Sequence, residues 1–498
     1  MKSLRLDALR HAFPDLNIVG DPATLVTGIT QDSRKVTKGS LFVARTGETS
    51  DGKKYIQEAL NRGATAVLSD EEFDGISGLV STDVERAVGP LAHFIYERPT
   101  SVMRSIGVTG TNGKTTITHL LRSVLDAIDT QGGLVLVGTV GCSYRDWNVP
   151  LSHTTPEADE LAYLLHEAVE RGATCAAMEV SSIALELGRV AGCMFEVAAF
   201  SNLTQDHLDF HETMEAYARA KKKLFGPSYA KNAVVCVDGA VGRDLAAETS
   251  LPVLTVSAVV GTKADIVPLS VEHSPRGLRA KLRTPDGDVT LESPLLGAHN
   301  LENLMVVIGC ATVLKVPIHQ VLDALRTATG APGRLENVST ASDDVTVLVD
   351  YAHTPDALER VLEGCRPFTK GKLVCVFGCG GDRDPTKREP MGRAAALGAD
   401  HVIVTNDNPR SEDPAAIAAT VVRGVKEVGR PFDVELDRAV AIKRAILSAE
   451  PGDLIVVAGK GHETYQIIGT QKLAFDDRVI AKSVLTERRE KMDSPRKT

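Results

Sequence analysis

Short apolar runs alternate with amphipathic stretches through the middle of this chain of 498 residues. Residues 105–109 read as a buried strand, and in residues 115–127 the apolar positions fall on one face of a helix. Further buried strands are predicted at residues 173–180, 197–203 and 233–237. Alternation of buried strands with helices is typical of a mostly parallel sheet that helices cover.

The same alternation returns toward the carboxyl end of the chain. Strands are predicted at residues 345–349, 373–377, 401–405 and 454–458. Helices are predicted between them, at residues 355–365 and 439–449. Each strand ends in a polar, acidic or glycine-containing loop, and in open α/β sheets ligands bind at those carboxyl ends.

A smaller block precedes the middle one. It has short apolar strands at residues 40–44 and 64–68, and it ends in a linker around Pro99. We therefore predict an α/β chain with a small amino-terminal domain, a central parallel-sheet domain and a Rossmann-like carboxyl-terminal domain. Their predicted bounds are residues 1–102, 103–332 and 333–498.

Composition narrows the class of protein. The hydrophobic fraction of 43%, the charged fraction of 24% and the net charge of −9 describe an ordinary globular enzyme rather than a nucleic-acid-binding protein. No apolar run is long enough for a signal peptide or a membrane span. The eight cysteines have no zinc-type spacing and suit reduced, buried thiols of a cytosolic protein. Residues 487–498 are strongly polar and are expected to fray.

A glycine-rich turn follows the strand at residues 105–109. Its residues 110–116 read GTNGKTT and lead into a helix, so backbone N–H groups and the positive helix end can hold a polyphosphate. Lys114 would neutralise the β- and γ-phosphates, and the Thr115 hydroxyl would bind Mg²⁺. The strict phosphate-loop pattern has glycine where Val108 stands, so the alternative is an ordinary glycine-rich turn with a chance Gly-Lys-Thr.

Glu179 closes the strand predicted at residues 173–180. A carboxylate is costly to bury unless a partner compensates its charge. On a strand that follows the phosphate loop, Glu179 suits a Mg²⁺ ligand. The alternative is a structural glutamate in a salt bridge.

Six ordered motifs resemble those of the Mur ligases of peptidoglycan synthesis. They are residues 110–115 (GTNGKT), 178–182 (MEVSS), 202–211 (NLTQDHLDFH), 297–303 (GAHNLEN), 332–336 (PGRLE) and 350–355 (DYAHTP). The resemblance covers nearly the whole chain. It implies an ATP-dependent amide ligase whose first domain binds a UDP-linked substrate, whose second binds ATP and whose third binds an amino acid.

Within the family, the chain is most similar to members that add meso-2,6-diaminopimelate to UDP-N-acetylmuramoyl-L-alanyl-D-glutamate through an acyl phosphate. Residues 407–410 (DNPR) resemble the signature of these members, and the planar fork of Arg410 suits the second carboxylate of diaminopimelate. The nearest alternative is the L-lysine-adding ligase. A folylpolyglutamate synthase lacks residues 407–410 and 459–463 (GKGHE), and a nucleotide-switched regulatory protein would bind ATP without ligating anything.

The resemblance assigns residues to each ligand. ATP falls to Gly110, Thr111, Asn112, Gly113, Lys114, Thr115, Thr116, Asn300, Arg334 and Asp350. The UDP-muramoyl-dipeptide falls to Ser33, Thr154, Thr155, Ser182 and Arg189. Diaminopimelate falls to Arg388, Asp407, Asn408, Arg410, Gly459 and Glu463. Mg²⁺ falls to Thr115, Glu179, His207 and Lys221, and the catalytic roles to Lys114, His207, Lys221 and Arg334.

Two segments read differently with and without the resemblance. Residues 217–225 predict a helix whose lysines would form a solvated basic face, whereas the family has a carbamylated lysine at the position of Lys221. A carbamate would turn that cation into an anion able to bind Mg²⁺. Ile183 and Leu187 depart from the family, which has His and Gln there, so hydrogen bonds near Ser182 are expected to differ. The resemblance implies small-molecule substrates. Together with the charge, the cysteines and the absence of a long apolar run, we expect a cytoplasmic protein, a monomer, with no nucleic-acid partner and no membrane insertion.

Overall fold

The computed structural model describes residues 2–45, 51–274, 277–340 and 342–493. The chain forms two compact units. The first comprises Met1–Val267, Thr284–Asp286 and Glu302–Ala324. The second comprises Pro268–Arg283, Gly287–Leu301 and Leu325–Thr498. None of the helices in the described ranges combines the length and the apolar character that crossing a membrane requires.

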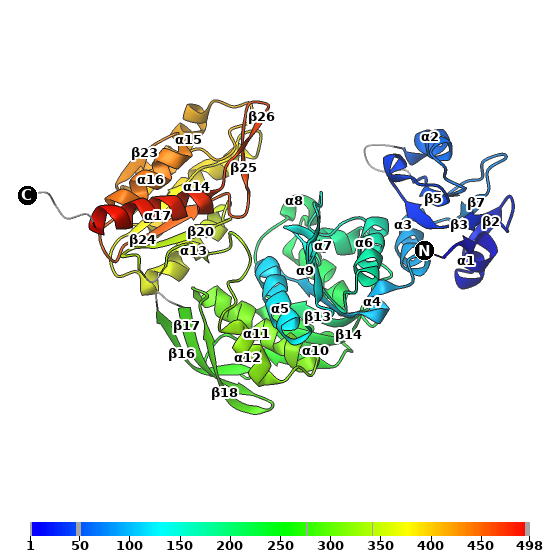
Figure 1. Cartoon of the computed structure of the whole chain (residues 1–498), viewed down its shortest axis with the longest axis horizontal. Coiled ribbons are helices and arrows are strands. Elements are labelled where there is room, and N and C mark those ends of the chain that lie inside the picture. Colours follow the sequence, from blue (N-terminus) through cyan, green and yellow to red (C-terminus); the bar gives the residue numbers. More distant parts are fainter. Residues whose placement is uncertain (1, 46–50, 275–276, 341, 494–498) are drawn as a thin grey trace, which may run out of the picture. The chain divides into compact units, whose positions relative to one another are not determined.

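A five-stranded sheet forms the amino-terminal part of the first unit (Figure 1). Its strands, in spatial order, are β2 (Asn17–Val19), β7 (Gly78–Val80), β6 (Ala66–Ser69), β5 (Ser40–Val43) and β4 (Gly28–Thr30). All neighbouring pairs are parallel except that of β2 and β7. The sheet is covered by α3 (Val84–Ile95), and the strands predicted at residues 40–44 and 64–68 are confirmed as β5 and β6.

An eight-stranded sheet forms the rest of the first unit. Its order is β11 (Trp147–Val149), β10 (Gly141–Tyr144), β9 (Leu134–Gly138), β12 (Cys175–Glu179), β8 (Arg104–Thr109), β13 (Phe195–Phe200), β14 (Ala230–Cys236) and β15 (Val253–Val256). The strands β9, β12, β8, β13, β14 and β15 run parallel to one another, as predicted, whereas β10 pairs antiparallel with β9 and β11. Because β8 is central, the glycine-rich turn after it lies between the carboxyl ends of β12 and β13.

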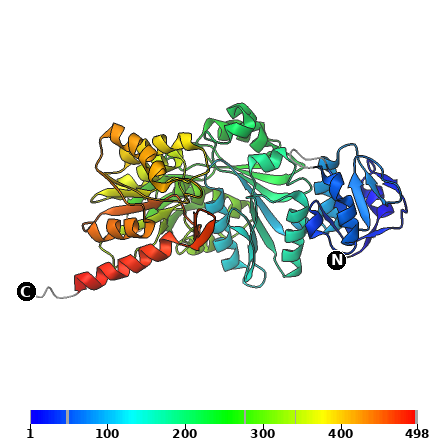
Figure 2. The ribbon, with the colours of Figure 1, turned by 90° about the horizontal axis from the view of Figure 1, so that it is seen from above.

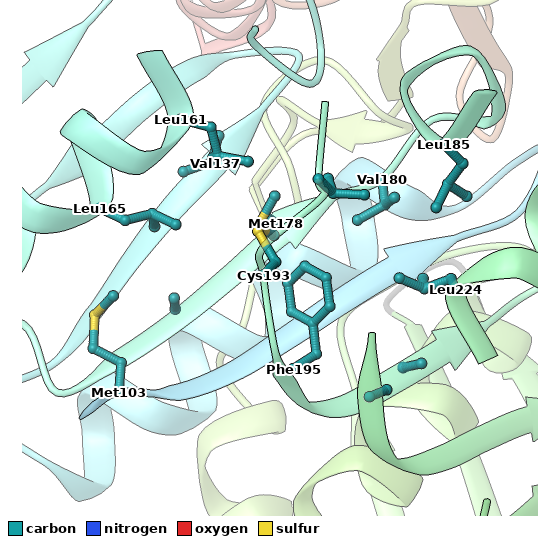
Figure 3. Packing of buried hydrophobic residues seen from close by; sticks show 14 of the residues in the cluster. Met103, Val137, Leu161, Leu165, Met178, Val180, Leu185, Cys193, Phe195 and Leu224 are labelled. Atoms are coloured by element: carbon teal, nitrogen blue, oxygen red, sulfur yellow. The ribbon is translucent and has the colours of Figure 1, made fainter. Parts of the chain in front are cut away.

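Apolar residues hold helices against this sheet. Met178 of β12 and Phe195 of β13 are buried together with Leu161 and Leu165 of α6 (Ala158–Glu170), as Figure 3 shows. Helix α5 (Lys114–Ile128) packs against β9 and β12. Burial of this kind stabilises by about 25 cal/mol per Å² of apolar surface. The core therefore fixes the strand ends from which the loops of the site project.

A six-stranded sheet is the centre of the second unit. Its order is β19 (Glu336–Asn337), β20 (Thr346–Asp350), β24 (Leu454–Ala458), β21 (Leu373–Phe377), β22 (His401–Val404) and β23 (Phe432–Val434). All pairs but the first are parallel. The parallel-sheet folds expected for the central and carboxyl-terminal parts are therefore confirmed.

Successive residues of these strands face opposite helical layers. Leu348 packs with α13 (Pro355–Cys365), α14 (Arg388–Gly398) and α15 (Pro414–Val428). Val347 and Val349 pack with α16 (Arg438–Ser448) and α17 (Asp477–Asp493). Side chains of a strand alternate between its faces, so a strand buried on both sides is apolar throughout.

Two features of the second unit differ from expectation. The three-stranded sheet of β16 (Val267–Ser274), β17 (Gly277–Thr284) and β18 (Gly287–Ser293) was not predicted. The expectation that the polar end frays was wrong up to Asp493, because α17, the red helix in Figure 2, continues to that residue. Arg488 in its last turns makes a two-pronged bond to the carboxylate of Asp344, at 2.8 and 2.7 Å. Residues 494–498 lie outside the described ranges.

Candidate active site

The glycine-rich turn of the first unit has the backbone of a phosphate loop. Gly110 and Gly113 have φ values of +151° and +90°, which side chains rarely adopt. A Cβ atom at Gly110 would collide with Ser201 Oγ, and one at Gly113 would collide with Asn303 Oδ1. Lys114, the first residue of α5, folds back so that its Nζ donates to the carbonyl oxygens of Gly110 and Thr111, both at 2.9 Å. The turn thus places Lys114 at the start of a helix although position 108 is valine and not the glycine of the strict pattern.

The loop after β13 holds this turn in place. The backbone N–H of Asn112 donates to Asn202 Oδ1 at 2.9 Å, and the N–H of Thr111 donates to the carbonyl of Asn202 at 2.8 Å. Ser201 Oγ donates to the carbonyl of Asn112 at 2.6 Å. Backbone groups of the turn are therefore fixed before any ligand arrives.

Glu179 lies at the end of β12 with a side chain that is almost fully buried. Its Oε2 accepts from Thr115 Oγ1 at 2.9 Å and from Thr139 Oγ1 at 3.1 Å, and its Oε1 accepts from the N–H of Thr139 at 2.8 Å. Within the described part of the chain, Glu179 forms no ion pair, so the salt-bridged alternative is wrong. A buried carboxylate beside hydroxyl oxygens is the hard donor set that fits Mg²⁺.

Lys221 is buried, contrary to the reading of residues 217–225 as a solvated basic face. Its Nζ donates to the carbonyl of Gly110 at 2.8 Å and lies 4.5 Å from the ring centre of Tyr217. Burial and the nearby Lys114 ammonium hold the pKa of Lys221 well below its usual range. Lys222 and Lys223 instead form ion pairs with Glu248 and Glu186. Lys221 alone among the three lysines is thus placed beside the phosphate loop as an amine that is easily kept neutral.

Two histidines lie near Tyr217, which itself bonds to the loop through Thr111 Oγ1 at 3.2 Å. The His207 ring is 6.1 Å from the Tyr217 ring and pairs with Asp206, and its side chain keeps 42% of its exposure. His211 is buried and its Nε2 is 2.9 Å from Ser182 Oγ. An imidazole therefore reaches Ser182 from the end of the short helix α8 (Leu208–His211), although Ile183 stands where the family has histidine.

Four of the five residues expected to bind the muramoyl dipeptide lie around the end of β12. Thr154 Oγ1 is 3.2 Å from Thr139 Oγ1, and Thr155 Oγ1 donates to the carbonyl of Glu179 at 2.8 Å. Arg189 donates to the carbonyl of Thr155 at 3.3 Å, and its buried Nε has no hydrogen-bond partner in the described ranges. The fifth residue, Ser33, donates to Glu58 Oε2 at 3.3 Å in the amino-terminal part of the unit, and no hydrogen bond among the described residues joins it to the other four.

In the second unit, the carboxyl end of β20 carries Asp350. Its two oxygens accept from the N–H groups of Leu335 and Ala352, both at 2.7 Å, and burial raises its pKa. The guanidinium of Arg334 lies 4.6 Å from the ring centre of Tyr351, and its buried Nε lacks a hydrogen-bond partner in the part of the chain that the structure describes. Asn300, near the start of α11 (Ala298–Val313), donates to the carbonyl of Leu296 at 2.8 Å.

The residues expected to bind diaminopimelate gather at the ends of β21, β22 and β24. Arg388 pairs with Glu412 at 2.7 Å, which raises the pKa of Arg388, and its Nε has no partner within the described residues. Arg410 donates through one terminal nitrogen to the carbonyl of Gly381 at 2.6 Å. Gly459 has a φ of +115°, and a Cβ there would approach Asp407 Oδ2 to 3.8 Å.

Three side chains of these sites were not predicted from the sequence: Thr139, Tyr217 and Lys460. Thr139 directly follows β9, whose buried strand pattern was the available signal. Tyr217 stands one helical turn before Lys221 in α9 (Met214–Lys222), so its side chain falls on the same face. Lys460 bonds to Asp407, Asn408 and Glu463, and its place between two glycines of residues 459–461 gave no sign of burial.

Comparisons with known proteins agree on one family. Three family profiles match: Mur ligase family, catalytic domain, at residues 25–96; Mur ligase middle domain at 108–311; and Mur ligase, glutamate ligase domain, at 333–461. The chain is 46% identical to a UDP-N-acetylmuramoyl-L-alanyl-D-glutamate–2,6-diaminopimelate ligase of Synechococcus elongatus, over 93% of this chain and 94% of that protein. It is 40% identical to the protein of the same name from Bacillus cereus, over 97% and 99%.

A solved structure shows the same likeness. A UDP-N-acetylmuramoyl-L-alanyl-D-glutamate–2,6-diaminopimelate ligase shares 36% identity with a TM-score of 0.74, over 98% of this chain and 99% of that one. A crystal structure of MurF from Acinetobacter baumannii, at 18% identity and a TM-score of 0.65, shows a shared fold.

Proposed function

The chain belongs to the Mur ligase family, and from that premise we propose that it adds meso-2,6-diaminopimelate to UDP-N-acetylmuramoyl-L-alanyl-D-glutamate with consumption of ATP. The observation that carries the proposal is that one chain contains two kinds of site. One is a phosphate loop with a buried Glu179, and the other is a set of arginines and carboxylates around Asn408. The named relatives at 40–46% identity are all diaminopimelate ligases, and nothing favours the lysine-adding alternative.

The first unit would activate the substrate. A carboxylate and an ammonium do not condense in water, so ATP would phosphorylate the D-glutamyl carboxylate to an acyl phosphate. Lys114 and the backbone N–H groups of the turn would neutralise negative charge that accumulates between the two anions. The phosphates would be held by Gly110, Thr111, Asn112, Gly113, Lys114, Thr115 and Thr116. Arg334, Asn300 and Asp350 are proposed for the rest of the nucleotide by family correspondence.

Mg²⁺ is part of the proposal, and the donor set fits it. Thr115 and Glu179 would hold one ion, and His207 with a carbamate of Lys221 would hold a second. When bound, the ions would offset phosphate charge during transfer. Only a neutral amine can react with CO₂, and the burial that lowers the pKa of Lys221 beside the Gly110 carbonyl favours that form and so supports this assignment.

The second unit would supply the nucleophile. Glu463 and Asp407 would accept from the distal ammonium of diaminopimelate, with Asn408 beside them, and Arg410 and Arg388 would donate to its distal carboxylate. The reacting amine must be unprotonated when it attacks the acyl phosphate, and the tetrahedral intermediate then collapses to amide and phosphate. The free, buried state of all eight cysteines supports a reducing compartment, so we also propose a cytoplasmic location. A monomeric state is a separate part of the proposal.

A coupled assay tests the proposal. Purified protein with ATP, Mg²⁺ and the UDP-muramoyl-dipeptide should release phosphate only when meso-diaminopimelate is added. Mass spectrometry should find the UDP-muramoyl-tripeptide in equal amount. Phosphate release without an amide product, or an amide product with L-lysine alone, would refute it.

A further inference from the structure

Lys460 is a fully buried cation at the end of β24. Its Nζ donates to Asp407 Oδ1 at 3.3 Å, to Asn408 Oδ1 at 3.1 Å and to Glu463 Oε2 at 2.9 Å. An ammonium group has three N–H donors and no acceptor. The three bonds therefore use every donor, and Lys460 has none left for a substrate.

The same bonds define which carboxylate oxygens remain available. Glu463 Oε2 also accepts from Asn408 Nδ2 at 3.0 Å, and Asn408 Oδ1 also accepts from the N–H of Ile467 at 3.0 Å. These partners leave the orientation of the Asn408 amide without ambiguity. Asp407 Oδ2 and Glu463 Oε1 take part in no hydrogen bond within the described ranges, so each carboxylate has one oxygen held by Lys460 and one left over.

The ion pairs of the buried cations near these two oxygens indicate which charge the oxygens can accept. The other buried cation nearby, Arg438, is neutralised by Asp477 through bonds of 2.8 Å from both Nε and a terminal nitrogen. Arg438 also donates to the carbonyls of Asn406 and Ala458, which fixes the backbone at the ends of β22 and β24. Among the described residues, the carboxylates of Asp407 and Glu463 form ion pairs with Lys460, so this group of three charges carries one more negative than positive charge.

We propose that Lys460 is a positioning residue for the amino-acid substrate: it joins the loops after β22 and β24 and turns the second oxygens of Asp407 and Glu463 into a paired acceptor for a substrate ammonium. A lysine at this place selects substrates with a distal cationic amine without contacting them. The inference rests on the proposed function and deepens it, because it names the residue that orients two of the proposed ligands of the substrate ammonium.

Steady-state kinetics of three variants test this role in the full chain. Lys460→Met removes the charge with little change of volume, Lys460→Arg keeps the charge, and Lys443→Met removes a half-exposed lysine on α16 as the control. With ATP and the UDP-muramoyl-dipeptide saturating, Lys460→Met should raise the KM for diaminopimelate about tenfold to a hundredfold. The KM values for ATP and the dipeptide should stay within about twofold, and Lys460→Arg should fall between Lys460→Met and the wild type.

A purely structural role predicts different results. It would lower kcat or the melting temperature and leave the KM for diaminopimelate unchanged, and that outcome would overturn the inference. A double-mutant cycle with Glu463→Gln adds a second measurement, in which the two losses should be strongly non-additive. If Lys460→Met does not fold, the intermediate KM of Lys460→Arg decides the matter. Should wild-type protein fail to ligate diaminopimelate, the proposed function fails before Lys460 is tested.

Discussion

Replacing Arg410 by lysine should remove selectivity for the second carboxylate of diaminopimelate while leaving the fold intact. The backbone of Arg410 is held independently of its side chain, because its N–H donates to the carbonyl of Ile467 at 3.2 Å and its carbonyl accepts from the N–H of Gly469 at 2.8 Å. A lysine keeps the positive charge but loses the planar fork. The φ of +51° is already adopted by a residue with a Cβ, so the exchange adds no new backbone strain.

The size of the loss follows from the hydrogen bonds. One terminal nitrogen of Arg410 is committed to the Gly381 carbonyl, which leaves the remaining N–H groups for a ligand. A hydrogen bond to a charged group contributes about 1.5–3 kcal/mol, and each 1.4 kcal/mol is about tenfold in kcat/KM. The ammonium group of the Arg410→Lys variant can replace one of two bonds, so kcat/KM for diaminopimelate should fall about tenfold to a hundredfold.

The assay compares kcat/KM for diaminopimelate and for L-lysine in the wild type, in Arg410→Lys and in Arg444→Lys. Arg444 is a half-exposed arginine of α16 that pairs with Asp433, and its exchange serves as the control. The value for L-lysine should change by less than about threefold in Arg410→Lys, since lysine has no second carboxylate to lose. Equal losses for both amino acids, or an unchanged ratio, would refute the assignment of Arg410.

Three further predictions follow from other buried charges. Glu179→Gln should lower kcat about a hundredfold and shift the Mg²⁺ dependence of phosphate release to higher Mg²⁺ concentration. The reason is that a neutral amide is a weaker Mg²⁺ ligand than a carboxylate. An unchanged Mg²⁺ dependence would contradict this prediction. Burial and Lys114 lower the pKa of Lys221 in the folded chain, so the unfolded chain binds one more proton, and the free energy of unfolding should rise as the pH approaches the ordinary pKa of 10.5. Urea unfolding of Lys221→Met should show a flatter dependence of this free energy on pH than the wild type. Equal slopes in the two proteins would exclude the lowered pKa. Arg438→Met leaves Asp477 buried without its partner and should cost about 3–5 kcal/mol in the free energy of unfolding, measured by denaturant titration, whereas a loss below about 1 kcal/mol would show that the pair is not desolvated.

Elements with a strong local signal were predictable. The apolar runs at residues 373–377 and 454–458 are strands with the same bounds in the structure, and residues 355–365 form α13 between Thr354, which caps the helix, and Arg366. A strand that is apolar on both faces is buried between two layers of helices. The parallel sheets could therefore be predicted from the apolar runs alone.

Features that depend on distant partners were not predictable from the pattern. In α17, the polar residues 487–493 are helical because Arg488 and Arg489 find the carboxylates of Asp344 and Asp343, which are far away in the sequence. The alternation in β17 was not recognised, although Leu278, Ala280 and Leu282 are buried in turn.

The two lysines with the most unusual surroundings show the same limit within the sites. Lys221 stands among lysines that are not buried, and only the folded chain brings the Gly110 carbonyl to its amine. Lys460 lies in a glycine-rich segment, and its three acceptors come from two different loops. Motif resemblance suggested the candidate substrate-binding residues around these two lysines, but the contacts that orient those residues join segments far apart in the sequence.

The most direct test of the proposed specificity is a competition between meso-diaminopimelate and L-lysine at equal concentration, with ATP, Mg²⁺ and UDP-N-acetylmuramoyl-L-alanyl-D-glutamate. Mass spectrometry of the products measures the ratio of the two kcat/KM values directly. We expect almost only the diaminopimelate-containing tripeptide, with one phosphate released for each amide formed. A lysine-containing product in equal or greater amount would contradict the assignment of Arg410 to the second carboxylate of diaminopimelate.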